Sequence, residues 1–396
     1  MRIYERLARL FELEGGRGRI LSMEGLRGLA VTLVFFFHYE ALFGAWVRPG
    51  TASASVAGFL GTVGRCGVDL FFVLSGYLIY GAVIKARGSE GGGYLGFMRR
   101  RFRRIYPTFL VMFSVYLALS KLAPGENKLP PGRLAALVYI VENALLLPGM
   151  FDIKPLMTVA WSLSYEVFYY AFIPLLVGAL AMRSWQPRAR VLTFLGLAGG
   201  FVVACFLGVE HVQLVLFISG ILVYEASQSR RVAALASRPA AQWIATFALA
   251  AFLPVVFVVL TGAAPGLPAS MGGRHVVRAI WLFGALFVVT LVVFRAAGPL
   301  RALFSVAPLR WLGNMSYSYY LMHGLALKAL ALAIARVRPG WNPGDAGHWA
   351  LLPIAFAVTL VSSAALFAAI EKRFSLGAPR PSPAQPVQAS GGLSLS

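Results

Sequence analysis

Charged residues and cysteines are scarce in this sequence. Only 13% of its 396 residues are charged and 59% are hydrophobic, whereas soluble domains carry about a quarter charged residues. The two cysteines, Cys66 and Cys205, fall within or beside apolar runs, so they offer neither a disulfide framework nor a CxxC metal motif. This composition excludes a soluble core with a single anchor and indicates a polytopic membrane protein.

Motifs of several catalytic classes are also missing from the sequence. There is no HExxH or similarly local pair of metal ligands, so we expect no metal site. There is no GxSxG nucleophile elbow, which favours direct group transfer over a covalent acyl-enzyme. The longest loop spans residues 122–157, whereas a lipid-linked glycan polymerase would need a large outer loop rich in catalytic polar residues.

Long apolar runs recur along the chain. Each is long enough, as a helix, to cross a hydrocarbon core about 30 Å thick. We therefore predict an all-α fold, a polytopic membrane helix bundle with about ten transmembrane helices. The predicted spans are residues 27–45, 66–85, 105–121, 158–181, 191–208, 211–227, 240–260, 277–296, 314–335 and 349–371.

The net charge of +21 is concentrated in short loops. Most of the 36 Lys and Arg residues lie in loops on the same side as the N-terminus, which is the positive-inside pattern. The charge therefore indicates orientation and contact with membrane lipids, and we expect no nucleic-acid partner. Both termini are predicted to be cytoplasmic, with residues 1–375 as one membrane domain and the Pro/Ser-rich residues 376–396 as a disordered cytoplasmic tail.

One apolar segment, residues 133–148, is a weak candidate for a span. It is only about 24 Å long as a helix, and it carries Glu142 and Asn143. If it crossed the membrane, every later basic loop would face outward. We predict an interfacial or re-entrant helix on the outer side.

Ionisable side chains inside the spans are candidates for function, because burying them without a partner is costly. His38 lies about 16 Å beyond Arg27, His323 about 14 Å into its helix, and Glu166 about 12 Å below the outer end of its helix. These three residues share a depth, whereas Asp69 lies about 6 Å below the outer surface. The group permits a general-base dyad, a proton relay or a metal site, and a neutral imidazole that only links helices is the structural alternative.

A cluster of arginines in FMRRRFRRIYPTFL, residues 97–110, precedes the third predicted span. Arg101 and Arg104 are spaced i and i+3, so they share a helix face, and Arg27 lies at the same membrane level. The rigid fork of guanidinium donors suits phosphate, which predicts a site for a phosphorylated donor. The alternative is an ordinary basic anchor that contacts anionic lipid headgroups.

Six motifs occur in order along the chain. Arg27 and His38 are separated by ten residues, and GVDLFFVLSGYLI, RRFRRIYP, WSLSYEVFYY, LGNMSYSYYLMH and IEKRF follow. Together they resemble the membrane-bound acyltransferase family 3, bacterial proteins that acylate surface polysaccharides, O-antigens, nodulation factors and some macrolides. The resemblance implies a ten-helix enzyme of the bacterial inner membrane. Such an enzyme passes an acyl group from cytoplasmic acyl-CoA, the donor substrate, to a hydroxyl of a carbohydrate or glycolipid acceptor.

The resemblance also assigns roles to residues. The family's arginine and histidine of the first span correspond to Arg27 and His38, and its paired arginines correspond to Arg101 and Arg104. Its other functional positions correspond to Glu24, Glu166 and His323. On this basis we predict that His38 is the general base and that coenzyme A docks on the paired arginines. The segment SYEVFYY departs from the family by lacking a second polar residue after the glutamate.

Two further expectations follow. Some family members carry a soluble SGNH-type hydrolase domain after the membrane core, and we expect such a module, if transfer needs one, to be a separate periplasmic transferase. The residues alone also permit a proton-coupled transporter in which His38, Glu166 and His323 relay protons. The paired arginines and the lack of visible inverted repeats favour the acyltransferase.

Overall fold

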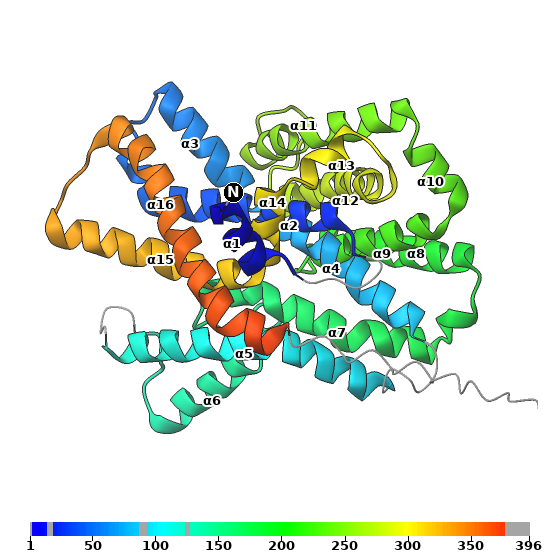
Figure 1. Ribbon diagram of the computed structural model, residues 1–396, viewed down its shortest axis with the longest axis horizontal. Helices are drawn as coiled ribbons and strands as arrows, with labels where there is room; N and C mark the ends of the chain where they lie inside the picture. Colours follow the sequence, from blue (N-terminus) through cyan, green and yellow to red (C-terminus); the bar gives the residue numbers. More distant parts are fainter. Residues whose placement is uncertain (1, 14–18, 87–92, 123–126, 377–396) are drawn as a thin grey trace, which may run out of the picture.

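The computed structural model describes residues 2–13, 19–86, 93–122 and 127–376, and the predicted tail at 376–396 lies outside them except for Leu376. The described residues form helices and no sheet (Figure 1). The α-helices are α1 (Arg2–Phe11), α2 (Leu21–Phe43), α3 (Ala52–Val63), α4 (Cys66–Lys85), α5 (Gly93–Leu122), α6 (Arg133–Ala144), α7 (Trp161–Ala179), α8 (Pro187–Phe206), α9 (Leu214–Gln228), α10 (Arg230–Ala236), α11 (Pro239–Thr261), α12 (Met271–Arg295), α13 (Pro299–Phe304), α14 (Ala307–Asn314), α15 (Ser316–Val337) and α16 (Gly344–Leu366). A π-helix, η6 (Phe367–Ser375), continues α16, and short 3-10 turns flank α2 and α7.

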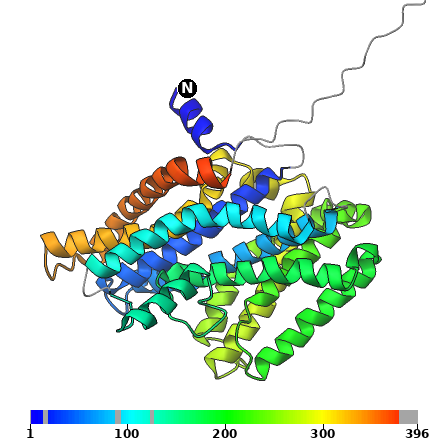
Figure 2. The same ribbon diagram turned by 90° about the horizontal axis from the view of Figure 1, so that it is seen from below.

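The predicted all-α polytopic bundle is confirmed. A helix occupies each of the ten predicted spans, and within the described ranges nine helical segments are long and apolar enough to cross a membrane. The tenth, α9, is apolar but has only 15 residues, about 22 Å. In Figure 1, α15 and α16 lie at one end of the bundle and α8 and α10 at the other, while α1 stands outside the long helices in Figure 2.

The structure adds helical segments that the apolar pattern did not predict. Helix α5 begins at Gly93, twelve residues before the predicted span, because its basic first turns are helical although they are too polar for the membrane interior. Helix α3 was not predicted, since its twelve residues are too few to cross a membrane. Helix α6, in the segment predicted to be interfacial or re-entrant, is about 18 Å long and is not among the candidate spans.

Helix α9 lies in the centre of the bundle, packed against α4, α8 and α12. It is apolar on every side and almost entirely buried, as expected for a helix with no lipid-facing or solvent-facing surface. Its contact with α4 depends on two glycines. A Cβ at Gly220 would lie 1.9 Å from the Val73 carbonyl oxygen, and one at Gly76 would lie 2.0 Å from the Phe217 carbonyl oxygen. The two backbones therefore touch, as small residues allow in membrane helices.

The close contact between α4 and α9 predicts a loss of stability when Gly220 is replaced by a larger residue. Gly220→Ala should destabilise the protein by about 1–3 kcal/mol, because the new methyl group meets rigid backbone rather than a movable side chain. Gly200→Ala on α8 is the matched control, since no atom lies within 4 Å of the added methyl. The two variants are compared by thermal unfolding in detergent, monitored as the loss of the monodisperse species. Equal melting temperatures for the two variants would contradict the α4–α9 contact.

The long helices run back and forth between two ends of the bundle. We call the end at which α2 begins the proximal face and the opposite end the distal face. At the proximal face, Ser22 near the start of α2 donates to the Val293 carbonyl near the end of α12, and Arg183 after α7 donates to the Val83 carbonyl near the end of α4. At the distal face, the Tyr39 hydroxyl donates to the His348 carbonyl. Helix direction therefore alternates as the charge pattern predicts.

Candidate active site

Helix α2 carries both Arg27 and His38, and its proximal half is held against α14. A Cβ at Gly313 would lie 1.7 Å from the Glu24 carbonyl oxygen, and one at Gly28 would lie 2.2 Å from the Leu309 carbonyl oxygen. This contact brings Arg27 beside the first residue of α15. Its guanidinium donates to the Ser316 hydroxyl at 2.8 and 3.0 Å. Arg27 is therefore fixed by packing and by two hydrogen bonds.

A proximal cavity of about 470 Å³ opens beside Arg27. Its walls include the segment before α2, the end of α4, the first turns of α5 and the end of α14. Its cationic lining residues are Arg19, Arg27, Lys85, Arg101 and Arg104. The structure thus brings together the three arginines that the sequence predicted as a donor site. This concentration of positive charge can hold a phosphorylated ligand.

The two paired arginines are held differently. Arg101 lies over the rings of Phe97 and Tyr170, at 5.1 and 5.4 Å from their centroids. Arg104 donates to Glu371 at 2.8 Å, so part of its charge is already paired. Arg101 is therefore the better placed of the two to meet a ligand phosphate.

Glu371 is fully buried on the π-helix η6. Besides Arg104, it accepts hydrogen bonds from the backbone N–H of Ser318 at 3.0 Å and from the hydroxyl of Ser318 at 2.6 Å. It thereby ties α5, α15 and η6 together at the proximal face. Short π-helical segments are uncommon and often occur at functional sites.

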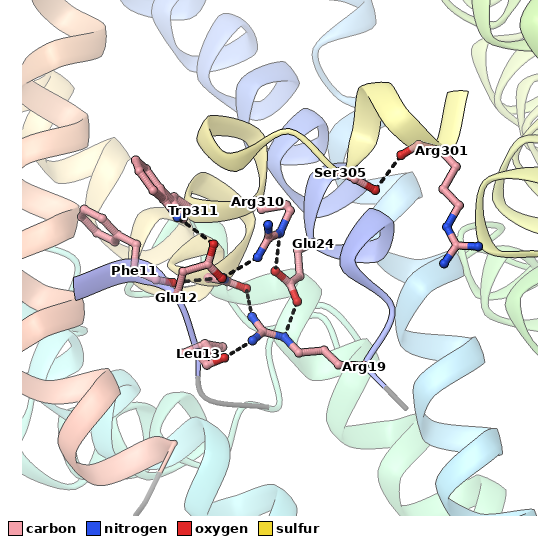
Figure 3. A network of polar contacts seen from close by, with 10 residues as sticks. Phe11, Glu12, Leu13, Arg19, Glu24, Arg301, Ser305, Arg310 and Trp311 are labelled. Atoms are coloured by element: carbon pink, nitrogen blue, oxygen red, sulfur yellow. Dashed lines mark hydrogen bonds and ion pairs between the residues drawn. The ribbon is translucent and has the colours of Figure 1, made fainter. Parts of the chain in front are cut away.

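Glu24 belongs to a network of ion pairs on the proximal side (Figure 3). It pairs with Arg19 and accepts from Arg310 at 3.4 Å, while Arg310 also donates to Glu12 at 2.5 Å. The Trp311 indole donates to the same Glu12 at 3.1 Å. Glu24 lines the proximal cavity but is balanced by two arginines, so in this structure it positions the α1–α2 segment against α14.

A smaller middle cavity of about 80 Å³ lies further into the bundle. Arg27 and Leu78 line both the proximal and the middle cavity. Glu166 on α7 also lines the middle cavity, where it accepts from the Tyr170 hydroxyl at 2.5 Å and from the Ser75 hydroxyl at 3.4 Å. Arg27 and Glu166 therefore face the same enclosed space.

His38 and His323 meet, as their common depth suggested. Their ring centroids are 4.8 Å apart with an interplanar angle of 66°. His323 is fully buried, and its Nδ1 donates to the Tyr319 carbonyl at 3.0 Å. That bond selects the tautomer whose Nε2 is an acceptor, and this atom has no partner within the part of the chain that the structure describes.

Glu166 shares the depth of the two histidines but lines a different cavity. His38 lines a distal cavity of about 370 Å³, and Glu166 lines the middle one. Val68 and Tyr320 line both cavities and so form the partition between them. The Tyr320 hydroxyl is 2.7 Å from the Ser162 hydroxyl. Glu166 and His38 therefore face different cavities, because an equal predicted depth does not place two helices side by side.

Asp69 lies in the distal cavity with His38. It is paired with Arg278 of α12 at 3.5 Å, and both side chains are buried. The sequence pattern singled out Asp69 but not its partner Arg278. It also missed Glu371, Tyr320 and Ser316, although all three lie in motifs that carried the family resemblance. A glutamate within the last apolar run was the available signal for Glu371.

The three cavities form a series through the bundle. The proximal cavity can hold a phosphorylated donor, the middle cavity places Arg27 and Glu166 together, and the distal cavity exposes an imidazole that can accept a proton. Among the described residues, no group of three or more His, Cys, Asp or Glu side chains is arranged to hold a metal ion.

Known proteins resemble this chain over most of its length. The model of a protein family described as an acyltransferase domain matches residues 20–368. The exopolysaccharide production protein ExoZ of Rhizobium meliloti is 30% identical over 282 residues, which cover 69% of this chain and 79% of ExoZ. The peptidoglycan O-acetyltransferase OatA of Listeria monocytogenes is 24% identical over 329 residues, which cover 78% of this chain but 49% of OatA. No solved structure matches the chain.

Proposed function

The chain belongs to the membrane acyltransferase family that its motifs resemble, and from this premise we propose that it is an O-acyltransferase that uses acyl-CoA. The acyl group, in the simplest case acetyl, passes from cytoplasmic acyl-CoA to a hydroxyl of a carbohydrate or glycolipid. The names of the relatives support this assignment, since one is an exopolysaccharide production protein and another is a peptidoglycan O-acetyltransferase. Family membership also favours acyl transfer over proton-coupled transport.

The series of cavities is the observation that carries the proposal. The basic proximal face is cytoplasmic in this proposal, because positive charge is retained on that side. The phosphates of coenzyme A bind in the proximal cavity near Arg101, and the thioester extends past Arg27 into the middle cavity. The acceptor enters the distal cavity, where His38 is exposed. Donor and acceptor then meet at the partition that Val68 and Tyr320 form.

The chemical step requires no stable intermediate on the enzyme. The acceptor oxygen forms a bond to the thioester carbonyl carbon as His38 takes the hydroxyl proton. The C–S bond then breaks and coenzyme A leaves as the thiolate, which takes up a proton. In this proposal Arg27, at the wall of the middle cavity, stabilises negative charge on the carbonyl oxygen, and His323 acts as a positioning residue through its contact with the His38 ring. A separate periplasmic transferase stays a prediction.

Purified protein and labelled acetyl-CoA test the proposed function. We expect saturable binding of acetyl-CoA, release of the free thiol of coenzyme A, and transfer of the label to a carbohydrate fraction from the native envelope. Acetate production without any labelled carbohydrate would indicate a hydrolase. Lack of acetyl-CoA binding by a monodisperse sample would rule the proposal out and favour a proton-coupled transporter.

The donor site makes a specific prediction. Arg101→Gln should raise the KM for acetyl-CoA by about 10- to 100-fold, because a charge-assisted hydrogen bond to phosphate contributes about 1.5–3 kcal/mol. Arg103→Gln is the matched control, since Arg103 is exposed on the same helix and does not line the proximal cavity. The rate of thiol release at varied acetyl-CoA concentration gives the KM of each variant. Equal KM values for the two variants would remove Arg101 from the donor site.

A further inference from the structure

The distal cavity contains a buried ion pair that the proposed reaction does not use. Asp69 of α4 and Arg278 of α12 are 2% and 3% exposed, and both side chains line the cavity that also exposes His38. Their closest contact, from Arg278 Nη2 to Asp69 Oδ1, is 3.5 Å. That distance is at the long limit of a hydrogen bond. The attraction between the two charges therefore offsets little of the free energy that burying them costs.

Each partner also has a polar atom without a hydrogen bond. Within the described residues, Oδ2 of Asp69 and Nε of Arg278 are buried and have no partner. A buried donor or acceptor left unsatisfied costs about 1–3 kcal/mol, more if it is charged. The pair therefore leaves one acceptor and one donor unsatisfied, and both side chains stand at the wall of a cavity of about 370 Å³.

The charges around the cavity restrict what can bind there. A carboxylate or phosphate would meet Asp69, and an ammonium group would meet Arg278 together with Arg65, which also lines the cavity. A neutral ligand with adjacent hydroxyl groups satisfies both, because a hydroxyl donates to a carboxylate and accepts from a guanidinium. Trp161 and Gln213 line the same cavity and provide an aromatic face and an amide. Aromatic faces and polar hydrogen-bonding groups together suit a sugar ring.

We infer that the distal cavity is the acceptor site, and that Asp69 and Arg278 hold two adjacent hydroxyls of a polyol or pyranose ring while a neighbouring hydroxyl is presented to His38. This inference rests on the proposed function and specifies its acceptor class. Asp69 and Arg278 are positioning residues, since they bind parts of the acceptor that do not react. They determine specificity by leaving two buried charges unsatisfied when the acceptor has only one hydroxyl.

Two probe alcohols separate this role from the chemical step. Methyl β-D-glucopyranoside carries adjacent hydroxyls, whereas n-butanol offers only one. With wild-type protein and labelled acetyl-CoA, we expect the glucoside to be acetylated with a much higher kcat/KM than n-butanol. In Asp69→Asn/Arg278→Gln, both charges are removed together, which avoids leaving one buried charge unpaired. We expect the glucoside KM of this variant to rise by about 10- to 100-fold, while the KM for acetyl-CoA and the rate with n-butanol stay at wild-type values.

A second buried ion pair provides the matched control. Arg190 and Glu225 pair at 2.6 Å near the proximal face, and neither lines the distal cavity. Arg190→Gln/Glu225→Gln should leave the glucoside KM unchanged. Melting temperatures of both double variants report folding, and the single variant Asp69→Asn repeats the test with a smaller structural change. Asp69→Asn should also raise the KM for the glucoside, because one carboxylate oxygen of Asp69 becomes an amide NH2 group, which donates a hydrogen bond instead of accepting one.

The outcomes distinguish the inference from the proposed function. Wild-type protein that binds no acetyl-CoA overturns the proposed function and the inference with it. Wild-type protein that acetylates the glucoside, combined with an unchanged glucoside KM in Asp69→Asn/Arg278→Gln, overturns the inference alone. Acetylation of n-butanol but not of the glucoside also overturns the inference alone, because the cavity would then not select adjacent hydroxyls.

Discussion

Replacing His38 with glutamine will lower acyl transfer by about 10²- to 10⁴-fold, the usual contribution of a general base. His38 is the ionisable group of α2 that lines the distal cavity, and its ring contacts the buried His323. Glutamine keeps a polar side chain of similar length but takes up no proton at neutral pH. The acceptor hydroxyl must then attack with its proton in place, which raises the barrier for forming the new C–O bond.

The measurement is transfer of labelled acetyl to an acceptor under single-turnover conditions, which isolates the chemical step. The KM for acetyl-CoA should change little, because His38 does not line the proximal cavity. His211→Asn is the control: His211 lies near the distal face, where its Nδ1 is 2.6 Å from the Tyr165 hydroxyl, and it does not line the cavity of His38. Transfer that persists undiminished in His38→Gln would contradict the assignment of the base.

Replacing Glu371 with alanine will destabilise the folded protein by about 2–4 kcal/mol, because a fully buried acceptor is removed and its hydrogen-bond donors lose their partner, although the Arg104 side chain is 27% exposed. The change leaves Arg104 without its carboxylate at 2.8 Å and leaves the N–H and hydroxyl of Ser318 without their acceptor. Because these groups lie on α5, α15 and η6, the loss also loosens the proximal cavity. We expect weaker acetyl-CoA binding in whatever fraction of the variant folds.

Thermal unfolding in detergent measures this effect. Glu371→Gln should lose less stability than Glu371→Ala, because the amide oxygen can still accept from Ser318. Asp345→Asn is the control for removal of a carboxylate from an exposed pair, since its partner Arg48 is 77% exposed, and surface pairs contribute about 0–1 kcal/mol. If Glu371→Ala and Asp345→Asn melt at the same temperature, Glu371 does not hold the three helices together.

The sequence was sufficient to predict the long apolar helices, but not α3 and several other short helices. Apolar runs placed a helix at all ten predicted ranges, and counting residues along two of them predicted that His38 and His323 could meet. The same count predicted an equal depth for Glu166, but it did not indicate that Glu166 lines the middle cavity with Arg27. It also gave no partner for Asp69, because Arg278 lies 209 residues away in the chain.

The amino-acid sequence is enough to predict the fold class, the alternating direction of the spans, and the order of Arg27 and His38 along one helix. These properties follow from apolar length, from the asymmetry of basic residues and from the fixed rise of an α-helix. The packing of the helices shows which groups face one cavity, that Arg104 is paired with Glu371, and that a buried ion pair lines the cavity of His38. The reason is that lateral neighbours depend on close backbone contacts such as those at Gly220 and Gly313, which no periodicity along a single helix encodes.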